Sequence, residues 1–379
     1  MGVSLFYLLS LIPIAIGAFL WYRDSEVVWW EWLCGAAVAI VTAALFHGIA
    51  VWGLGDDIET WSGQIVNSTH YPRWVEQYQE AHTRTVGSGK NEHTETYYTT
   101  EYRTHPEYWD AVTQYDGHEV SEGFFEEICR NFANYTVEKP WKMGFYSGDP
   151  HTYVSYNKTG FIYPATSLHH WQNRTKAAPS VFSFAKVPTN APVFSWPRND
   201  DWRRSGRLLG TAAAQFDLLA FDRMNARLGP TRKVNVIMVG FDMGSIELAH
   251  TQEAKWLGGK KNDLVLCYGG MSRNQPASWA YVFGWSESFL AKRNLESLLL
   301  RYPASPQLLQ LVEQEVQKNY RIKDWSKFDY ITIEPPTWSY VVFVFVLIGS
   351  QTGLYVYFHC NEFEKVIAAA DHCHGHYRY

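Results

Sequence analysis

The sequence predicts an α/β domain with helices on a mixed sheet, a β-rich region before it, and three helices that cross a membrane. Three observations support this fold class. Long uncharged apolar runs lie near both ends of the 379-residue chain. Helical and strand patterns alternate in the second half of the polar region between these runs. The first half of that region is instead rich in Tyr, Thr, Trp and His, with little helical periodicity.

Three apolar runs are long enough to cross a bilayer as helices, which rise by about 1.5 Å per residue. They span residues 3–22, 27–55 and 338–359. Glu31 is the only Asp, Glu, Lys or Arg within them, and it lies near one end, where water can solvate it. Trp and Tyr residues gather near the ends of the runs, as side chains in the headgroup zone do. We therefore expect a transmembrane hairpin over residues 1–55, and a linker with a third span over residues 331–359.

The first run has an alternative interpretation as a cleaved signal peptide. No basic residue precedes the run, and no small-x-small cleavage site precedes the second run. Three spans place the N-terminus and the polar region on one side of the membrane. The N-terminal MGVSL has no basic side chain to hold it in the cytosol. We expect an integral protein of the inner or plasma membrane with an extracytoplasmic domain, although the loop charges alone leave a cytosolic domain open.

The region 56–199 is expected to be β-rich. Residues 94–104, TETYYTTEYRT, combine β-branched and aromatic side chains, which is typical of a strand. Residues 124–134 predict a short helix. The region also contains the widely spaced histidines His70, His82, His93, His105 and His118. Three of them would suffice for a zinc site, but the spacing equally fits scattered surface residues.

Residues 200–330 are expected to form the α/β domain. Apolar residues recur at three- and four-residue spacing over residues 207–228, which predicts an amphipathic helix that Gly229 and Pro230 end. Uninterrupted apolar runs predict buried strands at residues 234–239, 264–268 and 278–283. Helical patterns occupy residues 246–256, 287–302 and 305–318.

The order of elements between residues 207 and 302, about a quarter of the chain, resembles the TPM domain. In that family an acidic helix ends in a Trp-x-x-Gly turn, and a basic turn with Asn or Asp leads into a central apolar strand. The residues that match this pattern are Trp256, Gly258, Gly259, Lys260, Asn262 and Asp263. The family often has Asp-Asn-Gly at this turn, where this chain has Asn262, Asp263 and Leu264.

The resemblance implies an envelope protein, because TPM-domain proteins are usually anchored outside the cytoplasm. Some are implicated in membrane-complex repair, channel accessory roles or phosphate-ester hydrolysis, and acidic loops of the family can hold divalent cations. The whole layout also resembles uncharacterised membrane proteins of large bacterial viruses. That second resemblance implies a phage-encoded protein that acts on the host envelope.

The turn at residues 258–263 contains glycines and lysines, but their order is not that of a phosphate-binding P-loop. A P-loop follows a strand and opens a helix, whereas these glycines end a helix and precede a strand. We expect Gly258 to cap the helix with a positive φ. Lys260 and Lys261 then lie at the negative end of the helix dipole.

A divalent cation is the only cofactor that the sequence suggests. Asp242, Glu247, His250 and Glu253 follow the first buried strand, where open α/β sheets bind ligands, and Asp263 opens the next strand. Mixed oxygen and nitrogen ligands suit such an ion. A solvated acidic face is the alternative interpretation.

The tail, residues 360–379, offers a second set of metal ligands. It contains His372, Cys373, His374 and His376. Dense tracts of this kind bind zinc, copper or nickel in solution. A disordered tail with incidental affinity is the alternative.

The sequence lacks the usual marks of nucleophilic catalysis and of nucleic-acid binding. No Gly-x-Ser-x-Gly elbow occurs. Cys267 lies in a predicted buried strand, and with Cys129 it would form either a disulfide or two free thiols. Net charge is −5 without clusters of Lys and Arg, which argues against nucleic acid. We expect a non-catalytic protein that binds the bilayer and envelope proteins, with self-association included. The alternative is a metal-dependent phosphohydrolase.

Overall fold

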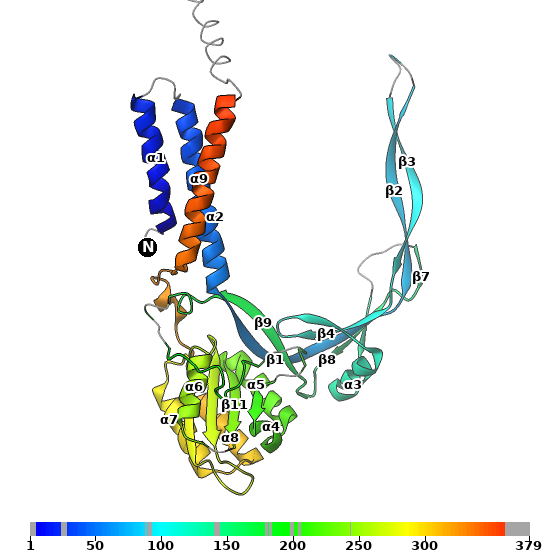
Figure 1. Ribbon diagram of the computed structural model, residues 1–379. Coiled ribbons are helices and arrows are strands. Elements are labelled where there is room, and N and C mark those ends of the chain that lie inside the picture. Colours follow the sequence, from blue (N-terminus) through cyan, green and yellow to red (C-terminus); the bar gives the residue numbers. More distant parts are fainter. Residues whose placement is uncertain are drawn as a thin grey trace, which may run out of the picture. The chain divides into compact units, whose positions relative to one another are not determined.

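The computed structural model describes residues 5–23, 29–87, 89, 93–139, 145–178, 181, 184–197, 201–203, 206–242 and 244–360. The chain divides into two compact units, whose elements are labelled in Figure 1. Unit 1 comprises Met1–Ile58, His170–Phe184 and Asp324–Tyr379. Unit 2 comprises Glu59–His169 and Ala185–Lys323.

Unit 1 contains three helices that are long and apolar enough to cross a membrane, which confirms the three predicted spans at the level of length and composition. They are α1 (Leu5–Arg23), α2 (Trp29–Gly55) and α9 (Thr337–Cys360). The ring of Phe6 packs against Phe46 and Phe343, with centroids 5.8 and 5.1 Å apart. Only 11–17% of each apolar span is buried within the protein, so most of its apolar surface is free to face lipid.

Polar contacts fix the chain of unit 1 where α2 ends. Asn173 donates from its backbone amide to the Gly55 carbonyl at 2.6 Å, and from Nδ2 to the Asp57 carboxylate at 2.8 Å. The Glu334 amide donates to the Ala177 carbonyl at 2.8 Å. The segment around Asn173 and Ala177 therefore links the end of α2 to the approach to α9.

The first part of unit 2 is built on a six-stranded sheet. Its strands are β1 (Asp56–Tyr71), β4 (Tyr108–Thr113), β5 (Gly117–Val120), β6 (Thr136–Glu138), β8 (Thr152–Tyr156) and β9 (Pro164–Gln172). Their order is β5-β4-β1-β8-β6, and β9 also pairs with β1. The helix α3 (Glu122–Phe132) buries Ile128 and Phe132 against Ile65 and Ala111. The short helix expected near residue 124 is therefore confirmed.

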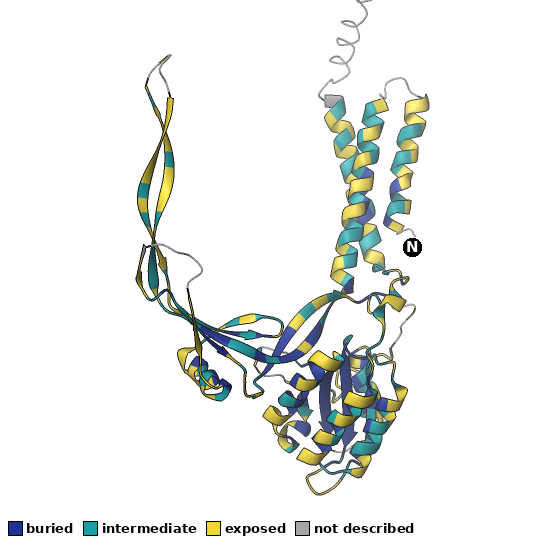
Figure 2. Cartoon of the chain, turned by 180° about the vertical axis from the view of Figure 1, so that it is seen from behind, coloured by how far each residue is buried: buried dark blue, intermediate teal, exposed yellow. Residues whose placement is uncertain are grey.

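A second sheet of unit 2 consists of a long hairpin and one short strand. β2 (Trp74–Val86) and β3 (His93–His105) pair antiparallel along their whole length, and β7 (Phe145–Gly148) pairs with the start of β2. The strand order is β3-β2-β7. The yellow and teal colouring of β2 and β3 in Figure 2 shows that side chains on both strands remain accessible.

The last part of unit 2 is an α/β domain with a covered sheet, as the alternating pattern predicts. β10 (Leu208–Gly210), β11 (Asn235–Phe241) and β12 (Asp263–Gly269) are parallel, and β13 (Trp279–Phe283) is antiparallel. The helices are α4 (Ala212–Gln215), α5 (Leu218–Arg232), α6 (Glu247–Lys255), α7 (Phe289–Arg301) and α8 (Pro306–Asn319).

The two central strands, β11 and β12, are buried at every position, which explains their uninterrupted apolar sequences. Val236 and Met238 face a core that they share with α5, α7 and α8. Ile237 and Val239 face the opposite core, with Ala249 of α6. Figure 2 shows these strands in dark blue between partly exposed helices.

The single helix expected over residues 207–228 is wrong. Leu208–Gly210 instead form β10, where Leu208 pairs with Met238 of β11. α5 then begins at Leu218, after the Asp217 cap, and continues through Pro230 to Arg232. Strand pairing with β11 overrides the helical spacing of the first three residues, because it satisfies their backbone groups within the sheet.

Candidate functional site

The hairpin formed by β2 and β3 has two faces of different chemistry. Because side chains alternate between the faces of a strand, the pairing register assigns every residue to one of them. One face carries charged, aromatic and histidine side chains, among them Glu76, Tyr78, Glu80, His82, Arg84, Glu95, Tyr97, Thr99, Glu101 and Arg103. The other face is uncharged and consists of Val75, Gln77, Gln79, Ala81, Thr83, Thr85, Thr94, Thr96, Tyr98, Thr100, Tyr102 and Thr104.

Contacts across the charged face hold the hairpin together. Arg84 forms an ion pair with Glu95 at 2.8 Å, and these two residues lie directly opposite each other. The guanidinium of Arg103 lies 5.1 Å from the centre of the Tyr78 ring. His105 stacks on Trp74 with centroids 4.2 Å apart. These contacts are exposed or only partly buried, and each is individually weak, so their number along the strands matters more than any one of them.

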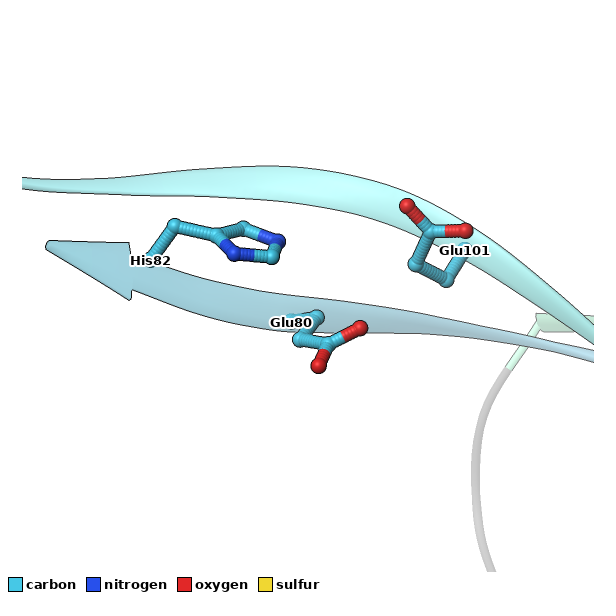
Figure 3. A group of neighbouring side chains, drawn as sticks. All are labelled: Glu80, His82 and Glu101. Carbon is cyan, nitrogen blue, oxygen red and sulfur yellow. The ribbon is translucent and has the colours of Figure 1, made fainter.

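Three potential metal ligands meet on this charged face. Ligand atoms of Glu80, His82 and Glu101 all lie within 4.8 Å of one another. Figure 3 shows the imidazole of His82 directed along the hairpin toward Glu101, with Glu80 between them on β2. Within the described residues, this is the one group of three or more His, Cys, Asp or Glu side chains close enough to share an ion.

A threonine between the ligands orients two of them. Thr99 Oγ1 donates to Glu101 Oε1 at 3.3 Å and lies 2.8 Å from His82 Nε2. His82 and Glu101 are half-buried, whereas Glu80 is exposed. Within the part of the chain that the structure describes, neither Glu80 nor Glu101 forms an ion pair with a basic side chain. Two neighbouring carboxylates repel each other, and a bound cation would relieve that repulsion.

The donor set at this site suits a divalent ion. One imidazole and two carboxylates are ligands for zinc or manganese, and three protein ligands leave coordination positions for water or for a group from another molecule. The sequence identified His82 as one of several scattered histidines, but it did not identify Glu80 or Glu101. The strand pattern of residues 94–104 indicates which side chains share a face of that strand. It does not give the pairing register that brings Glu101 close to Glu80 and His82.

The acidic residues after β11 do not form a comparable group. Asp242, Glu247 and His250 are exposed. Glu253 accepts a hydrogen bond from the Tyr281 hydroxyl at 2.7 Å, and the His250 ring lies 4.5 Å from the Tyr281 ring. Among the described residues, none of these four belongs to a group of ligands close enough to share an ion.

Asp263 is a buried structural carboxylate. It accepts hydrogen bonds from Trp196 Nε1 at 2.9 Å, Asn235 Nδ2 at 2.7 Å and the Lys260 amide at 2.9 Å. Burial raises the pKa of Asp263, and the hydrogen bonds from Trp196 and Asn235 oppose that rise. Because these donors occupy the carboxylate, Asp263 organises the turn that precedes β12.

The turn from Trp256 to Asp263 is shaped by backbone conformation. Gly258 and Gly259 have φ values of 82° and 89°, which confirms the positive φ expected at Gly258. The Gly258 amide donates to the Glu253 carbonyl at 3.0 Å, and the Trp256 indole donates to the Phe194 carbonyl at 3.0 Å. α6 is therefore closed by a cap in which Leu257, with a φ of 52°, is the first left-handed residue, and Gly258 contributes its amide rather than being the cap residue that we expected.

The remaining candidates from the sequence are the metal ligands of the tail and two cysteines. His372, Cys373, His374 and His376 lie outside the described residues. Cys129 and Cys267 are both free thiols. Burial raises the pKa of each thiol, so neither is an activated nucleophile.

No protein-family model, curated protein or solved structure matches the chain significantly. The fold itself defines the class: a protein with three candidate membrane-spanning helices, an α/β domain and an exposed β-hairpin.

Proposed function

We propose that this chain is a membrane-anchored binding protein, and that its hairpin contacts a protein partner. The observation that carries the proposal is the exposure of the uncharged face. Tyr98 and Tyr102 on this face are 64% and 69% exposed. A two-stranded hairpin is marginal in water, so thirteen paired positions that bury so little are better explained by a contact than by stability of the chain itself.

The chemistry of the uncharged face fits a protein surface. Tyrosine is enriched where proteins meet, since its ring buries area and its hydroxyl forms hydrogen bonds. Threonine and glutamine side chains offer further donors and acceptors without the cost of burying a charge. β3 also forms an edge of its sheet, so its outer backbone groups can pair with an added strand.

The proposal includes the cellular setting that the sequence suggests. We place the domain on the extracytoplasmic side of the inner or plasma membrane and treat residues 207–302 as TPM-like. The partner is then an envelope protein, and a phage-encoded chain would act on the envelope of its host. The resemblance of the turn between Trp256 and Asp263 to the TPM pattern supports this setting.

The proposal includes a divalent cation. The alternative function, a metal-dependent phosphohydrolase, is not supported by the acidic residues that follow β11. The group that could hold the ion, Glu80, His82 and Glu101, lies on the exposed hairpin. An open site of this kind does not exclude water from a reacting ester. We propose that an ion on this charged face stiffens the hairpin, while the opposite, uncharged face contacts the partner.

The test is site-specific photocrosslinking in intact membranes. A photoreactive residue replaces Tyr98 or Tyr102 in turn, and Leu300, which is 44% exposed on α7, serves as the matched control. We expect one discrete crosslinked species from both hairpin positions and none from position 300. The same species must be lost when Gln77 and Thr100, which face the partner on the same surface, are replaced by Lys and Glu.

The proposal is contradicted if the contact lies elsewhere on the protein. Crosslinks from position 300 with none from positions 98 and 102 would move the contact to the α/β domain. A species with twice the mass of the chain would identify the partner as a second copy.

A further inference from the structure

The strands of the six-stranded sheet and of the three-stranded sheet run into one another in the same order. β1 leads into β2, β3 into β4, and β7 into β8, each across two or three residues that belong to neither sheet. The neighbours β4-β1-β8 of one sheet are therefore continued by the neighbours β3-β2-β7 of the other (Figure 1). We call β2, β3 and β7 the arm. Residues 72–73, 106–107 and 149–151, which connect it to the six-stranded sheet, are the joint.

The pairing register continues through the joint without a shift between the first two strands. Tyr71 pairs with Tyr108 on the sheet side, and Trp74 pairs with His105 on the arm side. Each of the two strands has two residues between these pairs. The strands are thus in register for one continuous ribbon, whose ladder is interrupted at the joint.

A proline lies in the joint on each of the three strands that cross it. These residues are Pro72, Pro106 and Pro150. Proline has no backbone N–H, so it cannot donate a hydrogen bond to the ladder of a sheet. Three prolines on adjacent strands therefore leave a line across the sheet along which the ladder cannot close.

The third strand has one residue more than its neighbour at the same level. His70 pairs with Tyr153 on the sheet side and Trp74 pairs with Gly148 on the arm side, so four residues of this strand lie opposite three of the next. An extra residue on one strand is characteristic of a β-bulge, which bends that strand. Pro150 lies within this bulge, and Gly148 beside it has a φ of 92°, which glycine adopts without strain.

Stacked rings brace the two sides of the joint separately. On the sheet side the ring of Tyr71 stacks on Tyr108, with centroids 4.3 Å apart. On the arm side the ring of Trp74 stacks on His105, with centroids 4.2 Å apart. In both cases the stacked residues are also paired in the ladder, so each stack holds together two strands of its own side.

Two side chains of the joint itself are held by the sheet side. Glu107 Oε1 lies 3.0 Å from His70 Nε2, and the Tyr153 hydroxyl donates to the Asp149 carboxylate at 2.6 Å. The backbone that is least constrained therefore lies where the joint meets the arm. Gly148, the residue type with the widest choice of φ and ψ, is at this boundary.

We propose that the arm swings as one body about this joint. A hinge needs only a few residues at the ends of elements to absorb changes in φ and ψ. Because proline fixes its own φ, the change falls on ψ of the prolines and on the residues beside them. The arm keeps its shape, since β2 and β3 are paired along their whole length. The swing changes the direction of the uncharged face, a use that rests on the proposed function, whereas the swing itself belongs to the free protein.

The test is pulsed electron paramagnetic resonance on the full chain in nanodiscs. Spin labels are attached to genetically encoded non-cysteine residues, so that the native thiols stay in place. One label pair spans the joint, at Thr96 on β3 and Glu119 on β5, and the control pair lies within the arm, at Thr96 and Thr104. All three positions are exposed. We expect the distance distribution across the joint to be about twice as wide as that within the arm.

Replacement of the prolines tests the cause of the motion. Pro72→Val combined with Pro106→Val restores both missing N–H groups with a residue that favours strands, and the register already allows the ladder to close. The distribution across the joint should narrow to about the width of the control pair. Pro192→Val, at an exposed proline in the segment before β10, is the matched control and should change nothing.

Two results overturn the proposal. A wild-type distribution as narrow across the joint as within the arm would show that the prolines form a rigid bend. A distribution that stays wide in the double variant, with the distance within the arm unchanged, would show that the prolines are not the cause. If the double variant alters the distance within the arm, Pro106→Val alone decides, because Pro106 is exposed and its replacement needs no repacking.

The outcome is separable from that of the proposed function. A wide distribution without a photocrosslink from Tyr98 would leave the joint in place and remove the partner. A photocrosslink together with a narrow distribution would keep the partner and remove the joint.

Discussion

The indole of Trp196 donates a hydrogen bond to the Asp263 carboxylate at 2.9 Å, across 67 positions of sequence. This bond joins the segment that precedes the α/β domain to the start of its strand β12. Together with the hydrogen bonds from Asn235 Nδ2 and the Lys260 amide, it holds the Asp263 carboxylate in its buried position at the end of the turn.

Asp263→Asn is expected to destabilise the protein. The amide of asparagine would point its NH₂ group at one of the donors that the carboxylate accepts, and each unsatisfied buried donor costs about 1–3 kcal/mol. Thermal unfolding in detergent measures the loss. Asp242→Asn is the control, because Asp242 is exposed and its replacement should change stability by less than about 0.5 kcal/mol. Equal stability of Asp263→Asn and the wild type would contradict the structural role.

The comparison of the wild type with Asp263→Asn also predicts how stability depends on pH. Burial raises the folded-state pKa of Asp263 above its ordinary value of 3.8. The carboxyl group of Asp263 therefore binds its proton more tightly in the folded protein than in the unfolded chain. The resulting contribution to the free energy of unfolding is lost as pH rises from 3.8 through the raised pKa. The stability margin of the wild type over Asp263→Asn should narrow across that window. If the difference in stability instead widens with rising pH, the pKa of Asp263 is lowered by folding, which contradicts the prediction.

Gly229→Ala is expected to destabilise the protein at the contact between α5 and β1. A Cβ atom at this position would lie 2.0 Å from the Ser62 carbonyl oxygen, which is backbone and cannot rotate away. Overpacking of this kind costs about 1–3 kcal/mol, and thermal unfolding should report it.

Gly123→Ala is the matched control for that change. Gly123 also lies in a helix, but a Cβ atom there meets nothing within 4 Å. Alanine at position 123 should leave the unfolding temperature unchanged or slightly raised. If the two variants behave alike, Gly229 is not a close contact.

Zinc should bind to the hairpin through His82. The background for this measurement carries alanine in place of His372, Cys373, His374 and His376, so that the tail does not compete for the ion. Competition with a chromogenic chelator should show that His82→Gln lowers affinity at least tenfold, because one of three ligands is lost. His105→Gln on the same hairpin should have no effect, since His105 contacts Glu76 and Trp74 instead. Equal losses from both variants would contradict a site at His82.

The orientation in the membrane has a direct test. A reporter enzyme that is active only outside the cytosol, fused after Thr337, should be active if the domain is extracytoplasmic. The same reporter fused after residue 379 should be inactive, because α9 would return the chain to the cytosol. The reversed pattern would place the domain in the cytosol and remove the support for an envelope partner.

Much of the architecture was predictable because it depends on local composition. The uncharged runs of α1, α2 and α9, and the strands β11 and β12, follow from side chains that must avoid water along continuous stretches. Leu208 shows the limit of that reasoning. Its spacing to later apolar residues fits a helix, but pairing with Met238 makes it part of β10.

The sequence by itself determined the three apolar spans, the β-rich and α/β character of the regions between them, and the positive φ of Gly258. These features depend on the hydrophobicity and backbone preferences of neighbouring residues. Only the tertiary structure decided that Asp263 is held by Trp196, that Glu80 and His82 meet Glu101, and that Pro72 and Pro106 interrupt one ribbon. Each of these groups joins residues from separate segments, and the strand register and domain packing that bring them together depend on contacts across the whole chain.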